Sequence, residues 1–129
     1  MINKGIKGTQ EVKVTEANTA ITMGSGTLNV FATPAMVALM EETAWKSVAS
    51  ELGDGEGSVG IMMDIQHVAS TPVGMTVTCK TELTEVDGRK LTFKVEAYDE
   101  AGLIGKGTHE RFVVYNDKFQ AKADSKLAK

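Results

Sequence analysis

The chain has 129 residues, of which 42% are hydrophobic and 24% charged, and its formal net charge is −3. These values predict one domain with one hydrophobic core, and they exclude an intrinsically disordered chain and argue against nucleic acid as a partner. The single cysteine, Cys79, excludes an internal disulfide and a cysteine-rich zinc site.

The amino-terminal residues predict neither a signal peptide nor a membrane anchor. Residues 1–14 lack the apolar run of a secretory signal, and the chain has no stretch near the roughly 18 apolar residues that would cross a bilayer. We therefore expect a cytoplasmic protein with no membrane partner. Residues 1–8 are polar and are expected to form a loose lead-in, and the alternation of EVKVT predicts a strand at 11–15.

A loop is predicted next, in the stretch ITMGSGTLNVF. The Gly24-Ser25-Gly26 cluster interrupts any regular element there. Apolar residues on both sides of the cluster would let the loop cover a pocket. An ordinary connection between two elements is the simpler interpretation of the composition alone.

The clearest predicted element is a helix over residues 34–52. Thr33 is a favoured N-cap residue, Pro34 is favoured at the first helical position, and Gly53 supplies a typical stop. At roughly 1.5 Å per residue this helix would be about 28 Å long. Its first half is almost wholly apolar, which predicts burial on more than one side.

Four strand patterns follow the glycine-rich loop at 53–57. Alternating apolar residues predict strands at 59–67, 73–84, 91–97 and 103–115, with a hairpin turn at Asp87-Gly88. The polar, lysine-rich residues 117–129 are expected to be frayed.

This order of elements predicts an α+β hotdog fold, in which one long central helix is wrapped by a curved antiparallel sheet of about five strands. Strands joined by hairpin-length turns form a meander, and the helix must bury its apolar stripe against that sheet. We expect residues 1–129 to form a single domain of this kind. Its open edge strand favours dimerisation.

Glu41 occupies an unexpected place on the predicted helix. At about 100° per residue it falls within the stripe formed by Val37, Ala44 and Val48. A carboxylate facing a core is costly unless it is paired, hydrogen-bonded or protonated. Two interpretations remain open: Glu41 lines a functional pocket, or it lies where the stripe meets solvent and is held by a structural hydrogen bond.

His67 is the second polar residue on an apolar face. It continues the phase of Val59, Ile61, Met63 and Ile65 at the end of its strand. A single histidine in such a row is more often a satisfied core residue than a catalyst. Because this sheet must also cover the helix that carries Glu41, a pocket shared by the two residues is the functional alternative.

Thr33 has a sufficient structural role as a helix cap. It also lies at a helix amino terminus, where developing negative charge is favoured, so Thr33, Glu41 and His67 could surround a carbonyl whose oxyanion the helix stabilises. His109 and Arg111 share a strand face with Val113. A polar strand surface is the simpler interpretation of those two residues, and ligand contact is the alternative.

Several motifs that are typical of other enzyme classes are absent from the sequence. The chain contains no G-x-S-x-G elbow, no phosphate-binding loop, no dinucleotide-binding glycine pattern and no histidine pair with metal spacing. Trp45, the only tryptophan, lies at helical spacing and is expected to belong to the core.

Several segments resemble the fluoroacetyl-CoA thioesterase-like branch of the hotdog thioesterases. They are the run ATPAMVALMEETAW, the later Gly60 and His67, and the segment STPVGMTVTCKTELTEVDGRKLTFKVEAYDEAGLIGKGTHERFVV. The similarity extends over about residues 9–116. Its most specific part is a Thr-Pro pair, a glutamate eight residues beyond the threonine, and a histidine at the end of the next strand.

The resemblance implies that Thr33, Glu41 and His67 form an active site and that Gly60 lines the substrate pocket. It implies hydrolysis of a small acyl-CoA thioester to free acid and CoA, without a metal or redox cofactor, by a homodimer or tetramer whose site lies across an interface. Glu41 would act as nucleophile or activate water, Thr33 would orient the carboxylate or the substrate, and His67 would be the general base or acid.

The resemblance does not extend to a phenylalanine-rich lid over the substrate. The equivalent stretch offers Phe31 alone among aromatic residues, so we expect Phe31 to contact substrate and a general small acyl-CoA to be the substrate. Two other functions remain open: a hotdog module that binds acyl-CoA as a sensor without turnover, and a hotdog dehydratase. The dehydratase is disfavoured because the helix start lacks the aspartate and histidine that such enzymes pair.

Overall fold

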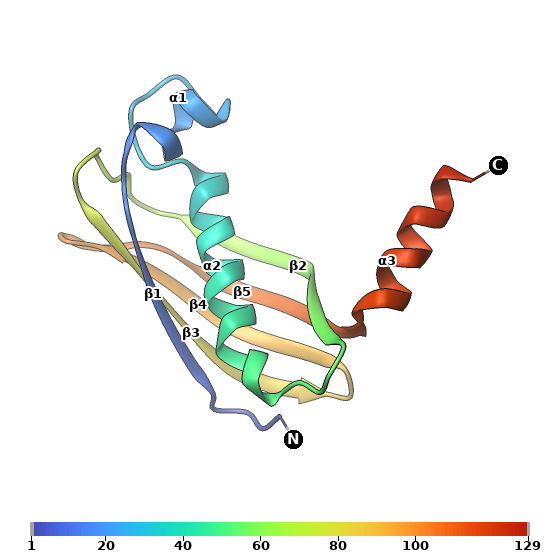
Figure 1. Ribbon diagram of the computed structural model, residues 1–129. Helices are drawn as coiled ribbons and strands as arrows, with labels where there is room; N and C mark the ends of the chain where they lie inside the picture. Colours follow the sequence, from blue (N-terminus) through green and yellow to red (C-terminus); the bar gives the residue numbers. More distant parts are fainter. Residues whose placement is uncertain (1, 129) are drawn as a thin grey trace.

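The computed structural model describes residues 2–128 (Figure 1). The regular elements are β1 (Lys7–Lys13), α1 (Ala20–Met23), α2 (Thr33–Val48), β2 (Glu56–His67), β3 (Thr76–Asp87), β4 (Lys90–Asp99), β5 (Gly102–Tyr115) and α3 (Asn116–Asp124). Short 3-10 turns lie at Glu16–Asn18, Ala49–Glu51 and Ser125–Leu127.

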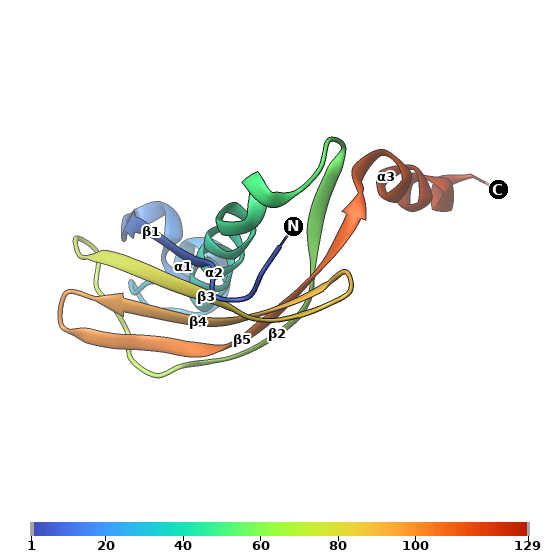
Figure 2. The same cartoon turned by 90° about the horizontal axis from the view of Figure 1, so that it is seen from below.

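The strands form one antiparallel sheet in the order β1-β3-β4-β5-β2. The sheet is curved, and α2 lies on its concave side (Figure 2). β1 and β2 are the two edges, and α2 connects them in the chain. One helix wrapped by five antiparallel strands is the architecture expected from the sequence. The β3–β4 hairpin turn falls one residue later than expected, at Gly88-Arg89, where Gly88 has a φ of +61°.

The core lies between α2 and the middle strands. Its fully buried side chains come from one stripe of the helix and from the inward faces of β3 and β4; they include Met36, Met40, Ala44, Val48, Val77, Leu83, Leu91, Phe93 and Val95. Burial of each large side chain contributes about 1.5–3 kcal/mol. Cys79 is also fully buried, and burial raises the pKa of its thiol to about 11.

Glycines let the helix approach the sheet closely. A Cβ on Gly8 of β1 would lie 2.8 Å from the Cβ of Ser47 and 3.0 Å from the carbonyl oxygen of Thr43. A Cβ on Gly105 of β5 would lie 2.5 Å from the sulfur of Met36. The 2.8 Å and 2.5 Å distances are shorter than real Cβ contacts, so a side chain at either position would force groups of α2 to shift.

The buried stripe of α2 differs from the predicted one. It is formed by Met36, Leu39, Met40, Thr43, Ala44 and Val48. Glu41 lies at the edge of this stripe, and Trp45 is 41% exposed and does not belong to the core. The first half of the helix is apolar on all sides, so its sequence could not identify which apolar face would meet the sheet.

The helix also starts differently from the expectation. Ala32 is the N-cap residue and makes no side-chain capping bond, and Thr33 is already helical. The regular helix ends at Val48 and a 3-10 turn continues to Glu51. The predicted role of Thr33 as the cap is therefore wrong, and its hydroxyl is free for another partner.

Both terminal segments are more ordered than expected. The amide of Gly5 donates to the carbonyl oxygen of Leu83 at 2.7 Å, and Ile2 and Ile6 pack against the core. Residues of the polar tail form α3, which projects from the body of the protein and buries none of its side chains (Figure 1). Asp117 in its first turn and Lys122 in its last complement the helix dipole. Residues 1 and 129 lie outside the described part of the chain. No helix in residues 2–128 combines the length and the apolar character needed to cross a bilayer.

Replacing Gly8 with alanine is expected to destabilise the fold by about 1–3 kcal/mol, because the added methyl group meets a backbone carbonyl that cannot move aside. Gly26→Ala is the matched control: its methyl group would lie 3.4 Å from the Cβ of Ala20, an ordinary contact. Denaturant unfolding at one protein concentration measures both variants. Equal midpoints for the two would contradict the packing argument.

Candidate functional site

A bulge in β2 changes which of its residues face α2. The register with β5 shifts between Gly60 and Met62, so Ile61 has no partner residue and is 51% exposed. Before the bulge, Gly60 faces the helix; after it, Met63 and Ile65 pack against the core. The single alternating row expected over 59–67 is therefore interrupted, and only its second half keeps the predicted phase.

Thr33 and His67 form a direct pair. Thr33 begins α2, His67 ends β2, and the hydroxyl oxygen of Thr33 lies 2.7 Å from Nδ1 of His67. Burial lowers the pKa of His67, so the ring is neutral at pH 7 and can accept a proton. Its other nitrogen, Nε2, is buried and has no hydrogen-bond partner among residues 2–128. A hydroxyl within hydrogen-bond distance of a neutral imidazole is the arrangement of a nucleophile and its general base.

This pair lines a pocket of about 340 Å³. The other lining residues are Ala20, Ser25, Val30, Phe31, Val68, Ala69 and Ser70. Phe31 is 1% exposed and forms a bridge with Thr19, which holds the 20–30 segment beside the pocket. The predicted loop thus contains α1 and contributes to a pocket wall, in agreement with the pocket interpretation.

Glu41 belongs to a second cluster. It lies eight residues beyond Thr33, or about 12 Å along a helix that rises roughly 1.5 Å per residue. Its Oε2 is 3.9 Å from Nη1 of Arg111, and a Cβ on Gly60 would lie 2.7 Å from the same oxygen. The side chain is 43% exposed, so the interpretation that Glu41 lies where the stripe meets solvent is the one that fits. A single chain therefore brings Thr33 to His67 but places Glu41 and Gly60 elsewhere.

Arg111 and His109 are buried, which contradicts the expectation of a polar strand surface. They are 5% and 1% exposed, and burial lowers the pKa of each. The signal that could have placed them was their phase: both share the inward face of β5 with Val113. The charge and polarity of the two side chains led to the opposite interpretation.

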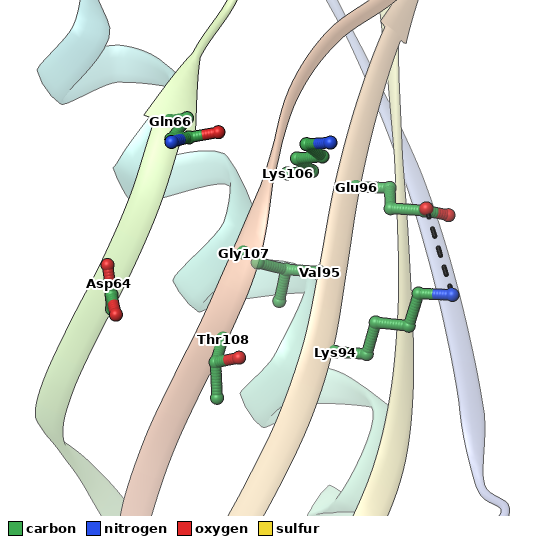
Figure 3. Close-up of a pocket in the computed structure, with 8 residues that line it drawn as sticks. All are labelled: Asp64, Gln66, Lys94, Val95, Glu96, Lys106, Gly107 and Thr108. Atoms are coloured by element: carbon green, nitrogen blue, oxygen red, sulfur yellow. Dashed lines mark ion pairs between the residues drawn. The ribbon is translucent and has the colours of Figure 1, made fainter.

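The outward face of the sheet carries a different hollow, of about 380 Å³ (Figure 3). Its rim is formed by charged and polar side chains from β2, β4 and β5, namely Asp64, Gln66, Lys94, Glu96, Lys106 and Thr108. Lys94 and Glu96 form an ion pair across 3.8 Å. The hollow contains neither histidine nor cysteine, so it lacks the base that the Thr33–His67 pair provides. Within residues 2–128, no three histidine, cysteine, aspartate or glutamate side chains form a group that could hold a metal ion.

Comparisons with known proteins identify the family of the chain. The family described as fluoroacetyl-CoA-specific thioesterase matches residues 14–117. A fluoroacetyl-CoA thioesterase from Streptantibioticus cattleyicolor is 47% identical over 97 residues, which are 75% of this chain and 70% of the relative. The chain belongs to this family. The expected class, a thioester hydrolase, is thereby confirmed.

Solved structures agree with the fold of this thioesterase. One structure of the fluoroacetyl-CoA thioesterase matches with a TM-score of 0.93 and 38% identity, covering 98% of each chain. Other structures are of variants, one in complex with acetyl-CoA and one with fluoroacetate and CoA. A thioesterase superfamily member from Thermus thermophilus matches with a TM-score of 0.87 and 30% identity, over 95% of this chain and 91% of that one. The predicted hotdog fold is confirmed.

Gly60→Ala is expected to lower turnover far more than stability. The new methyl group would lie 2.7 Å from Oε2 of Glu41, the far end of a flexible side chain that can move at a cost below about 1 kcal/mol. It would also lie 3.3 Å from Cε1 of His109, whose ring must shift by a few tenths of an ångström. Unfolding midpoints and thioester turnover measure the two effects. A fall in the unfolding midpoint large enough to account for the whole loss of turnover would contradict this contact.

Proposed function

We propose that the protein hydrolyses a small acyl-CoA thioester to the free acid and CoA. The observation that carries the proposal is the Thr33–His67 pair, whose hydroxyl and imidazole are 2.7 Å apart at the wall of a pocket. Membership of the family and the acyl-CoA ligands of the related structures support it. No metal or redox group takes part in the proposed steps.

In the proposed mechanism the neutral ring of His67 accepts the proton of the Thr33 hydroxyl, and the oxygen attacks the thioester carbonyl. The carbonyl oxygen becomes negatively charged beside the amino terminus of α2, where the helix dipole stabilises it. CoA leaves as a thiolate and takes a proton from His67, and water then hydrolyses the acyl group from Thr33. In this mechanism Thr33 is the nucleophile and not a group that orients the substrate.

Glu41 is assigned to the same site through a dimer. β2 is an edge strand, and two copies of it can pair antiparallel about a twofold axis. An axis near Met63 and Asp64 would bring Gly60 opposite the partner's His67. Because the Glu41 carboxylate lies directly over Gly60, it would come close to that histidine as well. Ile61 and Trp45, which are 51% and 41% exposed in a single chain, would be covered by this pairing. Each site would then combine Thr33 and His67 of one protomer with Glu41 of the other, where Glu41 orients or activates the hydrolytic water.

The proposed substrate is a general small acyl-CoA. The wall beside the Thr33–His67 pair is built from Phe31 and small or aliphatic side chains. Exposed residues of the same segment, Ile21, Met23 and Leu28, are aliphatic as well. The pocket-lining Val30, Phe31 and Val68 would supply apolar contact to a short acyl group, and the segment provides no second aromatic side chain to select a fluorinated one.

Release of free thiol from a panel of acyl-CoA thioesters tests the proposal. We expect turnover with short acyl groups by the wild type, and loss of most turnover in His67→Ala with CoA binding and folding retained, because only the base has been removed. Saturable acyl-CoA binding by the wild type without thiol release would instead support the sensor function.

Mixing two inactive variants tests the shared site. Glu41→Gln and His67→Ala protomers are each expected to be inactive as homodimers. If the site combines both chains, a mixed dimer has one intact site, and random one-to-one exchange restores about a quarter of wild-type activity. Thiol release is measured after exchange, with each variant alone as control. If all three residues act within one chain, the mixture stays inactive.

A further inference from the structure

The buried side chain of Arg111 is fixed on one side by Ser58 of β2. Its Nε donates to the hydroxyl of Ser58 at 2.8 Å, and its Nη2 donates to the carbonyl oxygen of Ser58 at 2.8 Å. Two charge-assisted bonds to one residue hold the guanidinium plane in a single orientation. The third nitrogen, Nη1, points away from Ser58 toward two other groups: Nε2 of His109 at 3.1 Å and Oε2 of Glu41 at 3.9 Å.

The neighbours of His109 determine where its proton is. Nδ1 lies 2.9 Å from the carbonyl oxygen of Met62, which can only accept, so Nδ1 carries the hydrogen. Nε2 faces Nη1 of Arg111, which can only donate, so Nε2 is unprotonated. His109 is therefore the neutral Nδ1–H tautomer. Burial and the charge of Arg111 lower the pKa of His109, while the bond to Met62 and the charges of Glu41 and Glu110 act in the opposite direction.

The ring of His109 is itself held in place. Met62 directly follows the bulged Ile61, so the bulge positions the carbonyl oxygen that receives the Nδ1 proton. On one face the ring stacks on Phe93, with the centroids 6.2 Å apart and an interplanar angle of 28°. The ring is 1% exposed and does not touch the Thr33–His67 pocket. Neither substrate contact nor solvent exposure therefore explains why an imidazole occupies this position.

We propose that His109 is a positioning residue for Glu41, acting through Arg111. Nη1 of Arg111 donates one hydrogen bond to Nε2 of His109, which leaves its other N–H directed at the Glu41 carboxylate. The inference rests on the proposed function, in which Glu41 completes the reacting site. His109 touches neither the substrate nor the transferred proton, and its contribution is the direction in which Arg111 presents its charge.

Two substitutions of similar size separate this role from simple packing. His109→Gln supplies an amide oxygen near the position of Nε2 that can accept from Arg111, whereas His109→Leu fills the space without an acceptor. We expect kcat of His109→Leu to fall about 10- to 100-fold, the loss typical when an orienting partner is removed, with KM within about 3-fold. His109→Gln should keep kcat within about 3-fold of the wild type. Equal losses in both variants, or no loss in either, would overturn the proposal.

A measurement without turnover keeps the proposal testable if His109→Leu does not fold. In nitrogen-15-labelled wild-type protein, the ring of His109 should show a protonated Nδ1 and an accepting Nε2, and the Arg111 guanidinium should rotate slowly. A protonated Nε2 or a freely rotating guanidinium would overturn the inference. Absence of thioester turnover by the wild type would contradict the proposed function alone, and these spectra would then decide whether His109 directs Arg111.

Discussion

The short distance between α2 and the sheet is the constraint on which the rest of the structure depends. The helix comes this close because Gly8 on one edge strand and Gly105 on β5 present no side chain to it. At this separation Met36, Met40 and Ala44 are fully buried, and the first residue of the helix reaches the last residue of β2. A larger separation would cost core contacts and would also break the bond between Thr33 and His67, so stability and the site share one geometric requirement.

The bulge at Ile61 places Gly60 and His67 of β2 on the same face of the sheet. In an unbroken strand, Gly60 and His67 are an odd number of residues apart and point to opposite sides. The extra residue reverses the phase between them, so that Gly60 lies under Glu41 while His67 reaches Thr33. The same irregularity turns the carbonyl of Met62 toward His109. One inserted residue thus serves both clusters of polar side chains.

The order of the elements and the fold could be predicted because they depend on patterns repeated over many residues. The alternation of apolar and polar residues predicted the strands of the meander, and the apolar run after Thr33-Pro34 predicted the helix. The face of the helix could not be predicted, because a segment that is apolar on all sides has no preferred stripe, and Glu41 and Trp45 were misplaced for that reason. The bulge was not predicted, although Gly60 within the strand pattern is the kind of isolated glycine that often marks one.

Single polar residues were harder to place than elements, because their chemistry permits more than one environment. Thr33 suits a helix cap, yet Ala32 takes that position and Thr33 bonds to His67. His109 and Arg111 suit a solvated strand, yet a serine, two backbone carbonyls and a carboxylate satisfy them in the interior. In each case the deciding partner lies more than 30 residues away in the chain, beyond the reach of any local pattern.

The burial of Cys79 has a consequence for a protein that releases a thiol with every turnover. Disulfides formed from CoA exchange with protein cysteines through the thiolate form, at a rate set by access and by the thiolate fraction. Cys79 is fully buried and its pKa is about 11, so almost none of it is ionised at neutral pH and none of it meets solvent. As this is the only cysteine in the chain, the folded protein offers no accessible thiolate to disulfides that form when released CoA is oxidised.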